Sequence, residues 1–105
     1  MDEYKLLSDM ENLTEFVGGK IRIKGMVSDL PWQHLIGFQP GRQVRYFDID
    51  DFQIVIYPEK EIPSGVPVII GGTVIEVRGG GKGSKVDEEY AEYHIIVDWY
   101  EEMVL

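Results

Sequence analysis

The chain has 105 residues, a formal net charge of −9 and no cysteine. This length fits one domain with its own hydrophobic core, and the missing thiols exclude disulfide bonds and thiolate metal sites. No apolar run reaches the roughly 18 residues that a membrane-spanning helix requires, and the acidic N-terminus is unlike a secretory signal. We therefore expect a single cytoplasmic domain over residues 1–105 that does not associate with a membrane.

The acidity is concentrated at the two ends of the chain. Residues 20–85 contain nine basic and seven acidic residues, whereas the two ends together contain twelve acidic residues and one basic residue, Lys5. Binding to nucleic acid depends on Lys and Arg, so the net charge argues against it. The balanced centre still allows a local basic surface, and it is equally typical of solvated charges that keep a small protein soluble.

The first expected element is an amphipathic α-helix over residues 2–17. Gly18 and Gly19 follow it, which is typical of a helix C-terminus. We expect this helix to cover the core, with docking onto a partner as the alternative. Its apolar residues recur at helical spacing, and the main ones are Leu6, Met10, Leu13 and Val17.

From residue 20 onward the pattern predicts β-strands. Polar and apolar residues alternate, and β-branched and aromatic residues are frequent. Asp50 and Asp51 predict a tight hairpin, and Gly25, Gly71 and Gly72 predict bulges or sharp bends. The five expected strands lie within residues 20–27, 43–49, 52–57, 66–77 and 90–100.

The stretch RGGGKGSK, residues 78–85, contains the glycines and the lysine of a phosphate-binding loop. In that motif the lysine is followed directly by Ser or Thr, and a helix comes next. Here Lys82 is followed by Gly83, and the next element is a strand. We therefore interpret the stretch as a flexible connector before the last strand.

Five strands with a long loop after the first and a tight hairpin between the second and third resemble an OB-fold. This five-stranded Greek-key barrel binds oligonucleotides and oligosaccharides. The segments that carry the resemblance are GGKIRIKGMVSD, VRYFDIDDFQIVIY, GVPVIIGGTVIEVRG and EYHIIVDW.

Within that class the chain looks like replication-protein-A-like and anticodon-binding-like modules. Their fourth strand has a glycine and valine rhythm that Gly65, Val66, Gly71 and Val74 follow approximately. The resemblance covers about residues 18–102 and implies an all-β barrel preceded by one α-helix. Many members have a helix between strands three and four, and the eight-residue connector here has no room for one. The N-terminal helix is expected to cap the barrel instead.

The resemblance implies a ligand across the second and third strands, framed by the loop after the first strand and the loop before the fifth. Single-stranded nucleic acid is bound by aromatic rings that stack on bases and by cations that meet phosphates. The candidate nucleic-acid-binding residues in these places are Trp32, Phe38, Arg42, Arg45, Phe47, Tyr57, Arg78, Lys82 and Lys85.

Several of these rings also fit a structural role. Phe47 fits the core, and Trp32 and Phe38 fit buried anchors of their loop. Alternation predicts an exposed Tyr57, with Gln53 and Val55 on the same face. The predicted inward set is Phe52, Ile54 and Ile56, and Tyr93 and Trp99 are expected in the core with Ile95 and Val97.

Catalytic, cofactor and metal sites are not predicted. Asp50 and Asp51 are explained by the hairpin turn, and with Asp48 they offer fewer oxygens than Ca²⁺ requires. His34 and His94 lack the partners and spacing of a zinc site. No Gly-x-Ser-x-Gly motif is present. We expect a protein that is not an enzyme.

The leading hypothesis is a module that binds single-stranded DNA or RNA with little sequence preference. The alternative is an OB-fold adaptor subunit that contacts a larger protein partner in a DNA- or RNA-processing complex. The net charge and the acidic C-terminus, which ends in the apolar residues Met103, Val104 and Leu105, favour the adaptor. A third possibility is a small or sugar-like ligand in the same groove.

Overall fold

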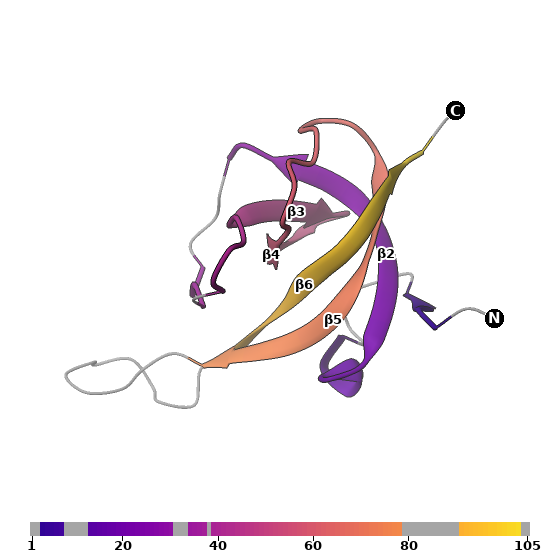
Figure 1. The fold of residues 1–105 in the computed structure, drawn as a ribbon. Helices are drawn as coiled ribbons and strands as arrows, with labels where there is room; N and C mark the ends of the chain where they lie inside the picture. The colour runs from indigo at the N-terminus through magenta and orange to yellow at the C-terminus, as the bar shows by residue number, and fades with distance from the viewer. Residues whose placement is uncertain (1–2, 8–12, 31–33, 38, 79–90, 104–105) are drawn as a thin grey trace.

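The computed structural model describes residues 3–7, 13–30, 34–37, 39–78 and 91–103. Strands dominate it, and the one short helical element is a single 3-10 turn, η1 (Figure 1). Over these described ranges, no helix is long and apolar enough to cross a membrane. The elements are β1 (Lys5–Leu7), η1 (Leu13–Phe16), β2 (Lys20–Ser28), β3 (Arg45–Ile49), β4 (Phe52–Tyr57), β5 (Val68–Arg78) and β6 (Ala91–Glu102).

Five of the strands close into a barrel. The order of hydrogen-bonded neighbours is β2, β3, β4, β6, β5, and β5 returns to pair with β2. All of these pairings are antiparallel except β4 with β6, which is parallel and comprises only Ile56 with Ile95 and Tyr57 with Ile96. The expected all-β barrel is confirmed, and its strand order is compatible with an OB-like barrel.

The barrel interior is filled by inward-facing aliphatic side chains. Alternation along β2 places Ile21, Ile23 and Val27 inside, each at most 2% exposed, and polar residues outside. Phe47 of β3 is also completely buried, which supports its interpretation as a core residue. The other strands complete the same cluster with Ile49, Ile54, Ile56, Val68, Ile70, Val74, Ile95 and Val97.

A β-bulge in the long β5–β6 ribbon changes which residues face inward. Gly72 pairs with Val97 and Gly71 pairs with Trp99, so Asp98 is an extra residue on β6. The bend predicted at these two glycines is thereby confirmed. The bulge also reverses the face of Trp99, whose indole lies against Gly71 so closely that a β-carbon there would clash. The expectation that Trp99 shares the core face with Val97 is therefore wrong.

The predicted N-terminal α-helix is wrong. Lys5–Leu7 forms β1, which pairs in parallel with residues 21–23 of β2, and Leu13–Phe16 forms only a 3-10 turn. β3 pairs with β2 only from Met26 onward, so the first half of that β2 edge is open to β1. Of the described residues of the predicted apolar face, Leu13 is buried, whereas Leu6 and Val17 are 53% and 48% exposed. Tertiary pairing outweighs the local helical pattern here.

The predicted exposed face of β4 is also wrong. Gln53, Val55 and Tyr57 are at most 5% exposed, and Phe52 of the predicted inward set is 48% exposed. β4 is buried on both faces because the chain after β2 folds back over the outside of the barrel. This covering segment forms part of the candidate functional site.

Candidate functional site

Residues 34–37, here named the strap, lie on the outer face of β4, β6 and β5. The Leu35 N–H donates to Oε2 of Glu92 at 2.9 Å, and the Gly37 N–H donates to the Tyr57 hydroxyl at 2.8 Å. A β-carbon at Gly37 would come within 3.3 Å of that hydroxyl and of Val77. The strap therefore fits closely over three adjacent strands.

The His34 side chain fixes the start of the strap. Its Nδ1 lies 2.9 Å from Oε1 of Glu92, its Nε2 lies 3.0 Å from Oε1 of Gln53, and its ring stacks on Tyr46 with 5.9 Å between centroids. The side chains of His34 and Glu92 are only 8% and 13% exposed. This pair is a largely buried contact between the loop and β6.

The hydrogen bonds of Gln53 orient its amide group relative to His34. The Gln53 amide nitrogen donates to the Leu30 carbonyl at 3.1 Å and to Oδ1 of Asp48 at 2.7 Å, so its oxygen must face His34. The two His34 nitrogens therefore face Oε1 of Glu92 and Oε1 of Gln53. Gln53 thereby connects the strap to β4.

His94 continues the network into the barrel wall. It is completely buried, with Nε2 at 3.0 Å from Oε1 of Glu92 and Nδ1 at 2.8 Å from the Tyr57 hydroxyl. Glu92 accepts from Nε2–H, so Nδ1 accepts from the tyrosine. Burial lowers the pKa of His94 below its usual value although Glu92 acts in the opposite direction, and burial raises the pKa of Tyr57. His94 is therefore neutral and Tyr57 protonated.

This arrangement changes the role of Tyr57. Its ring is fully buried, and its hydroxyl accepts from Gly37 and donates to His94. A ring that stacks on a nucleic-acid base must be accessible. With the strap in place, Tyr57 anchors the loop and offers no stacking surface.

Arg42 connects two strands at the seam of the barrel. Its Nη1 donates to the Tyr57 carbonyl at 2.9 Å and to the Val97 carbonyl at 2.6 Å, and Nη2 pairs with Glu59 at 3.1 Å. The parallel β4–β6 pairing ends beside these carbonyls. Arg42 thus closes the seam where the two strands separate.

The other candidate cations that the structure describes also have acidic partners. Arg45 contacts Glu61 at 2.8 Å with a side chain that is 33% exposed, and Arg78 contacts Glu76 at 2.9 Å with a side chain that is 63% exposed. The remaining candidates lie outside the described residues, namely Trp32, Phe38, Lys82 and Lys85.

The sequence interpretation did not connect His34, Gln53, Glu92 and His94. One local pattern was present, because Glu92 and His94 are two positions apart on a strand and so share a face. The His34–Glu92 contact joins residues 58 positions apart in the chain, and the His34–Gln53 contact joins residues 19 positions apart. No local pattern reports such pairs. Over the described part of the chain, no group of three or more His, Cys, Asp or Glu residues is arranged to hold a metal ion.

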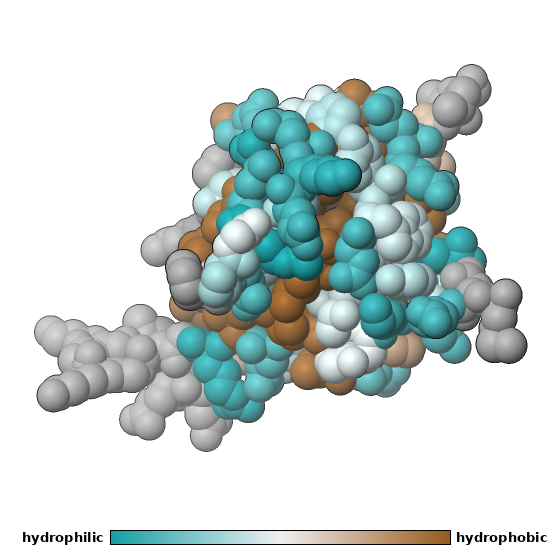
Figure 2. Space-filling view, in the orientation of Figure 1, coloured by the Kyte–Doolittle hydropathy of each residue, from teal (hydrophilic) through white to brown (hydrophobic). Residues whose placement is uncertain are grey.

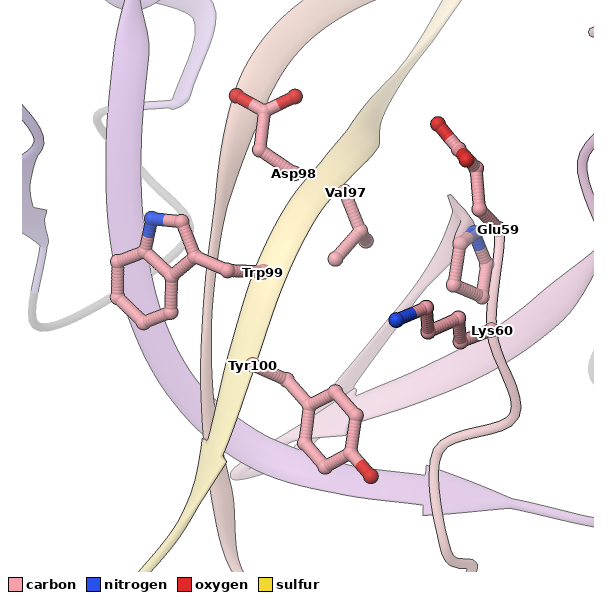
Figure 3. Close-up of a pocket in the computed structure, with 7 residues that line it drawn as sticks. Glu59, Lys60, Val97, Asp98, Trp99 and Tyr100 are labelled. Atoms are coloured by element: carbon pink, nitrogen blue, oxygen red, sulfur yellow. The ribbon is translucent and has the colours of Figure 1, made fainter.

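The described surface also contains hollows away from the strap. On the face that carries β6, Figure 2 shows an apolar strip between hydrophilic residues. One hollow of about 320 Å³ lies between residues 58–60 and residues 97–100. There Val97 and Tyr100 face Lys60 across the gap, whereas Trp99 extends to the opposite side of β6 (Figure 3). Two further hollows of about 450 and 470 Å³ adjoin each other and share Met26 and Asp48.

Comparison with known proteins adds no family. Neither a protein-family model nor a curated protein sequence matches the chain. The architecture is a closed five-stranded β-barrel.

Proposed function

We propose that this chain is a non-enzymatic adaptor barrel that binds a protein partner. The observation that carries the proposal is the strap. It occupies the outer face of β4 and β6 through Glu92, Gln53 and Tyr57, close to where the OB resemblance implies a ligand. A module whose ligand face is filled by its own loop has to use another surface to bind.

The charges support the same proposal. Arg42, Arg45 and Arg78 each contact a glutamate, and the chain carries a net charge of −9. Nucleic-acid affinity comes largely from cations that replace the counterions of phosphates. An acidic surface with paired arginines favours a protein partner of opposite charge.

The buried His34–Glu92–His94–Tyr57 chain contains residue types that also act in catalysis. Here each histidine nitrogen and both oxygens of Glu92 have a partner inside the protein. None of these four residues lines any of the three hollows described above. We interpret the chain as structural, because a fully satisfied buried network rigidifies the region that contains it.

Binding of single-stranded nucleic acid is the alternative proposal. The strand order is compatible with an OB-like barrel, a class that includes oligonucleotide-binding domains. Arg78 ends β5 with a side chain that is 63% exposed, and the connector after it contains Lys82 and Lys85. On this alternative the connector meets phosphates while the strap remains in place.

A paired experiment separates the two proposals. Fluorescence anisotropy with labelled oligo-dT and oligo-U at low salt is expected to show no binding up to about 100 μM protein, the weak limit of non-specific association. The tagged chain, used as bait, is expected to recover a protein that re-forms a complex of fixed stoichiometry when both purified components are mixed in sedimentation velocity.

A salt-dependent rise in anisotropy that disappears in the double variant Lys82→Ala, Lys85→Ala would overturn the adaptor proposal in favour of the nucleic-acid module. The double variant Lys20→Ala, Lys24→Ala is the matched control, because it removes the same charge from β2.

A further inference from the structure

The two adjoining hollows form one groove on the outside of the barrel, here named the methionine groove. It crosses the second half of β2, between the β3–β4 hairpin on one side and the connector before β5 with the end of β6 on the other. Its first part is lined by Met26, Val27, Ser28, Asp29, Leu30, Asp48, Ser64 and Gly65. Its second part is lined by Lys24, Gly25, Met26, Asp48, Asp50, Pro67 and Met103.

Large apolar side chains are exposed along this groove. Leu30 is 79% exposed, Met26 is 40% exposed and Met103 is 37% exposed. Exposed apolar groups that gather in one hollow indicate an interaction site more often than single exposed residues do. Methionine is unbranched and polarisable, so two methionines adapt their shape to different apolar side chains.

Acidic groups border the same groove. Asp29, Asp48 and Asp50 line it, and Lys24 is the one basic residue among its lining residues. Asp48 and Asp29 accept hydrogen bonds from neutral groups, Gln53 and Ser64, respectively. Arg42, Arg45 and Arg78 contact glutamates instead.

The groove is also connected to the strap network. Gln53 donates to Oδ1 of Asp48 and to the Leu30 carbonyl, and its oxygen accepts from His34. Both Asp48 and Leu30 line the groove. The wall of the groove is therefore held in position by the buried network, which pre-organises it for binding.

We propose that the methionine groove binds an extended segment of the partner protein in which apolar and basic side chains alternate. This inference rests on the proposed adaptor function and names the surface and the chemistry of the partner. The apolar side chains would contact Met26 and Met103, and the basic side chains would meet the aspartates. A second copy of this chain is disfavoured as the occupant because each copy carries a net charge of −9.

The probe for the test is a fluorescein-labelled peptide of alternating leucine and lysine, about eight residues and some 26 Å long when extended. Anisotropy is expected to show binding that weakens severalfold when salt is raised, since exposed charges are screened. A peptide of alternating leucine and glutamate is the control for charge. The variant Met26→Lys is expected to weaken binding of the leucine–lysine peptide at least about tenfold, as loss of a central apolar contact does.

The matched control is Val17→Lys, which makes the same kind of change at an exposed apolar residue that contacts Val74 of β5 and does not line the groove. The location is read directly from the methyl signals of protein with ¹³C-labelled methionine. The chain has four methionines, and the signals of Met26 and Met103 are expected to move most on addition of the peptide.

The outcomes distinguish this inference from the adaptor function beneath it. Absence of leucine–lysine peptide binding, or equal binding of the leucine–glutamate peptide, overturns the proposed chemistry. Binding that is unchanged by Met26→Lys and leaves the signals of Met26 and Met103 in place overturns the proposed surface. In each of these cases, a reconstituted complex with a recovered protein partner would still support the adaptor function. Failure to form any such complex would contradict both the adaptor function and the proposed groove.

Discussion

The outer face of β4 and the methionine groove lie on the same barrel and share Gln53 as a link, yet they are built in opposite ways. Under the strap, charged and polar side chains are buried and paired with one another, as in the His34–Glu92 contact. In the groove, apolar side chains such as Met26 are partly exposed to solvent. The first arrangement stabilises the fold, whereas the second leaves apolar surface that a partner can bury.

This contrast predicts where substitutions cost stability and where they cost binding. The largest effect is expected for Glu92→Ala. The carboxylate contacts the rings of His34 and His94 and accepts from the Leu35 N–H, and its removal leaves several buried polar groups without this partner. We expect a loss of about 3–5 kcal/mol in the free energy of unfolding, measured by urea denaturation.

Glu101→Ala is the matched control for that experiment. Glu101 is an exposed glutamate on the same strand, and we expect its removal to change the free energy of unfolding by no more than about 0.5 kcal/mol. Equal costs for Glu92→Ala and Glu101→Ala would show that the buried network does not hold the strap.

The next largest effect is expected for His34→Ala. It removes both ring nitrogens and leaves the Gln53 oxygen without its His34 partner, at a cost of about 1–3 kcal/mol. Hydrogen exchange of the Leu35 and Gly37 amides, which donate to Glu92 and Tyr57, should accelerate more than exchange in β2. Uniform acceleration over all strands would contradict a local release of the strap.

The barrel strands were predicted well from the sequence, whereas the strap that covers the outer face of β4 was not predicted. The difference has a physical cause. Strands such as residues 20–28 are encoded locally, by side chains that alternate between two faces. The burial of the outer face of β4 depends on the strap. The contact between them joins Gly37 and Tyr57, which are 20 positions apart in the chain. Similarly, one extra residue at Asp98 reverses the face of Trp99, and alternation alone does not report a bulge.

The same distinction holds for the candidate site. Tyr57 was correctly located on β4 and Arg42 in the loop before β3, but their partners were not predictable. Arg42 donates to the carbonyls of Tyr57 and Val97, and a backbone acceptor has no signature in the amino-acid pattern. The exposed set in the groove was missed for the opposite reason, because Met26 and Met103 look like ordinary apolar residues.

A pH dependence follows from His94. Its pKa is lowered by burial, so the unfolded chain binds a proton near the usual value of 6.5 that the folded chain does not accept. Stability should therefore decrease as the pH falls below about 6.5, with a slope of at most one proton from this group. Urea midpoints at pH 7.5 and 5.5 measure the effect.

The control for the pH experiment is His94→Gln, an uncharged side chain that retains a donor toward Glu92. The difference between the two pH values should shrink in this variant, because the titrating group is gone. His34 and Glu92 face His94 from the strap and from β6 itself, and they remain in both proteins. An unchanged difference would show that His94 is not the source of the acid sensitivity.

The smallest effect on stability is expected where the largest effect on binding is proposed. Met26 is 40% exposed and points away from the core, so Met26→Lys should change the free energy of unfolding by no more than about 0.5 kcal/mol. Urea denaturation checks this, alongside the at least tenfold loss of affinity for the leucine–lysine peptide. A destabilisation as large as that of His34→Ala would mean that Met26 supports the barrel. A residue that serves binding does not need to stabilise the barrel. The proposed groove therefore predicts that substitution of Met26 changes the free energy of unfolding very little.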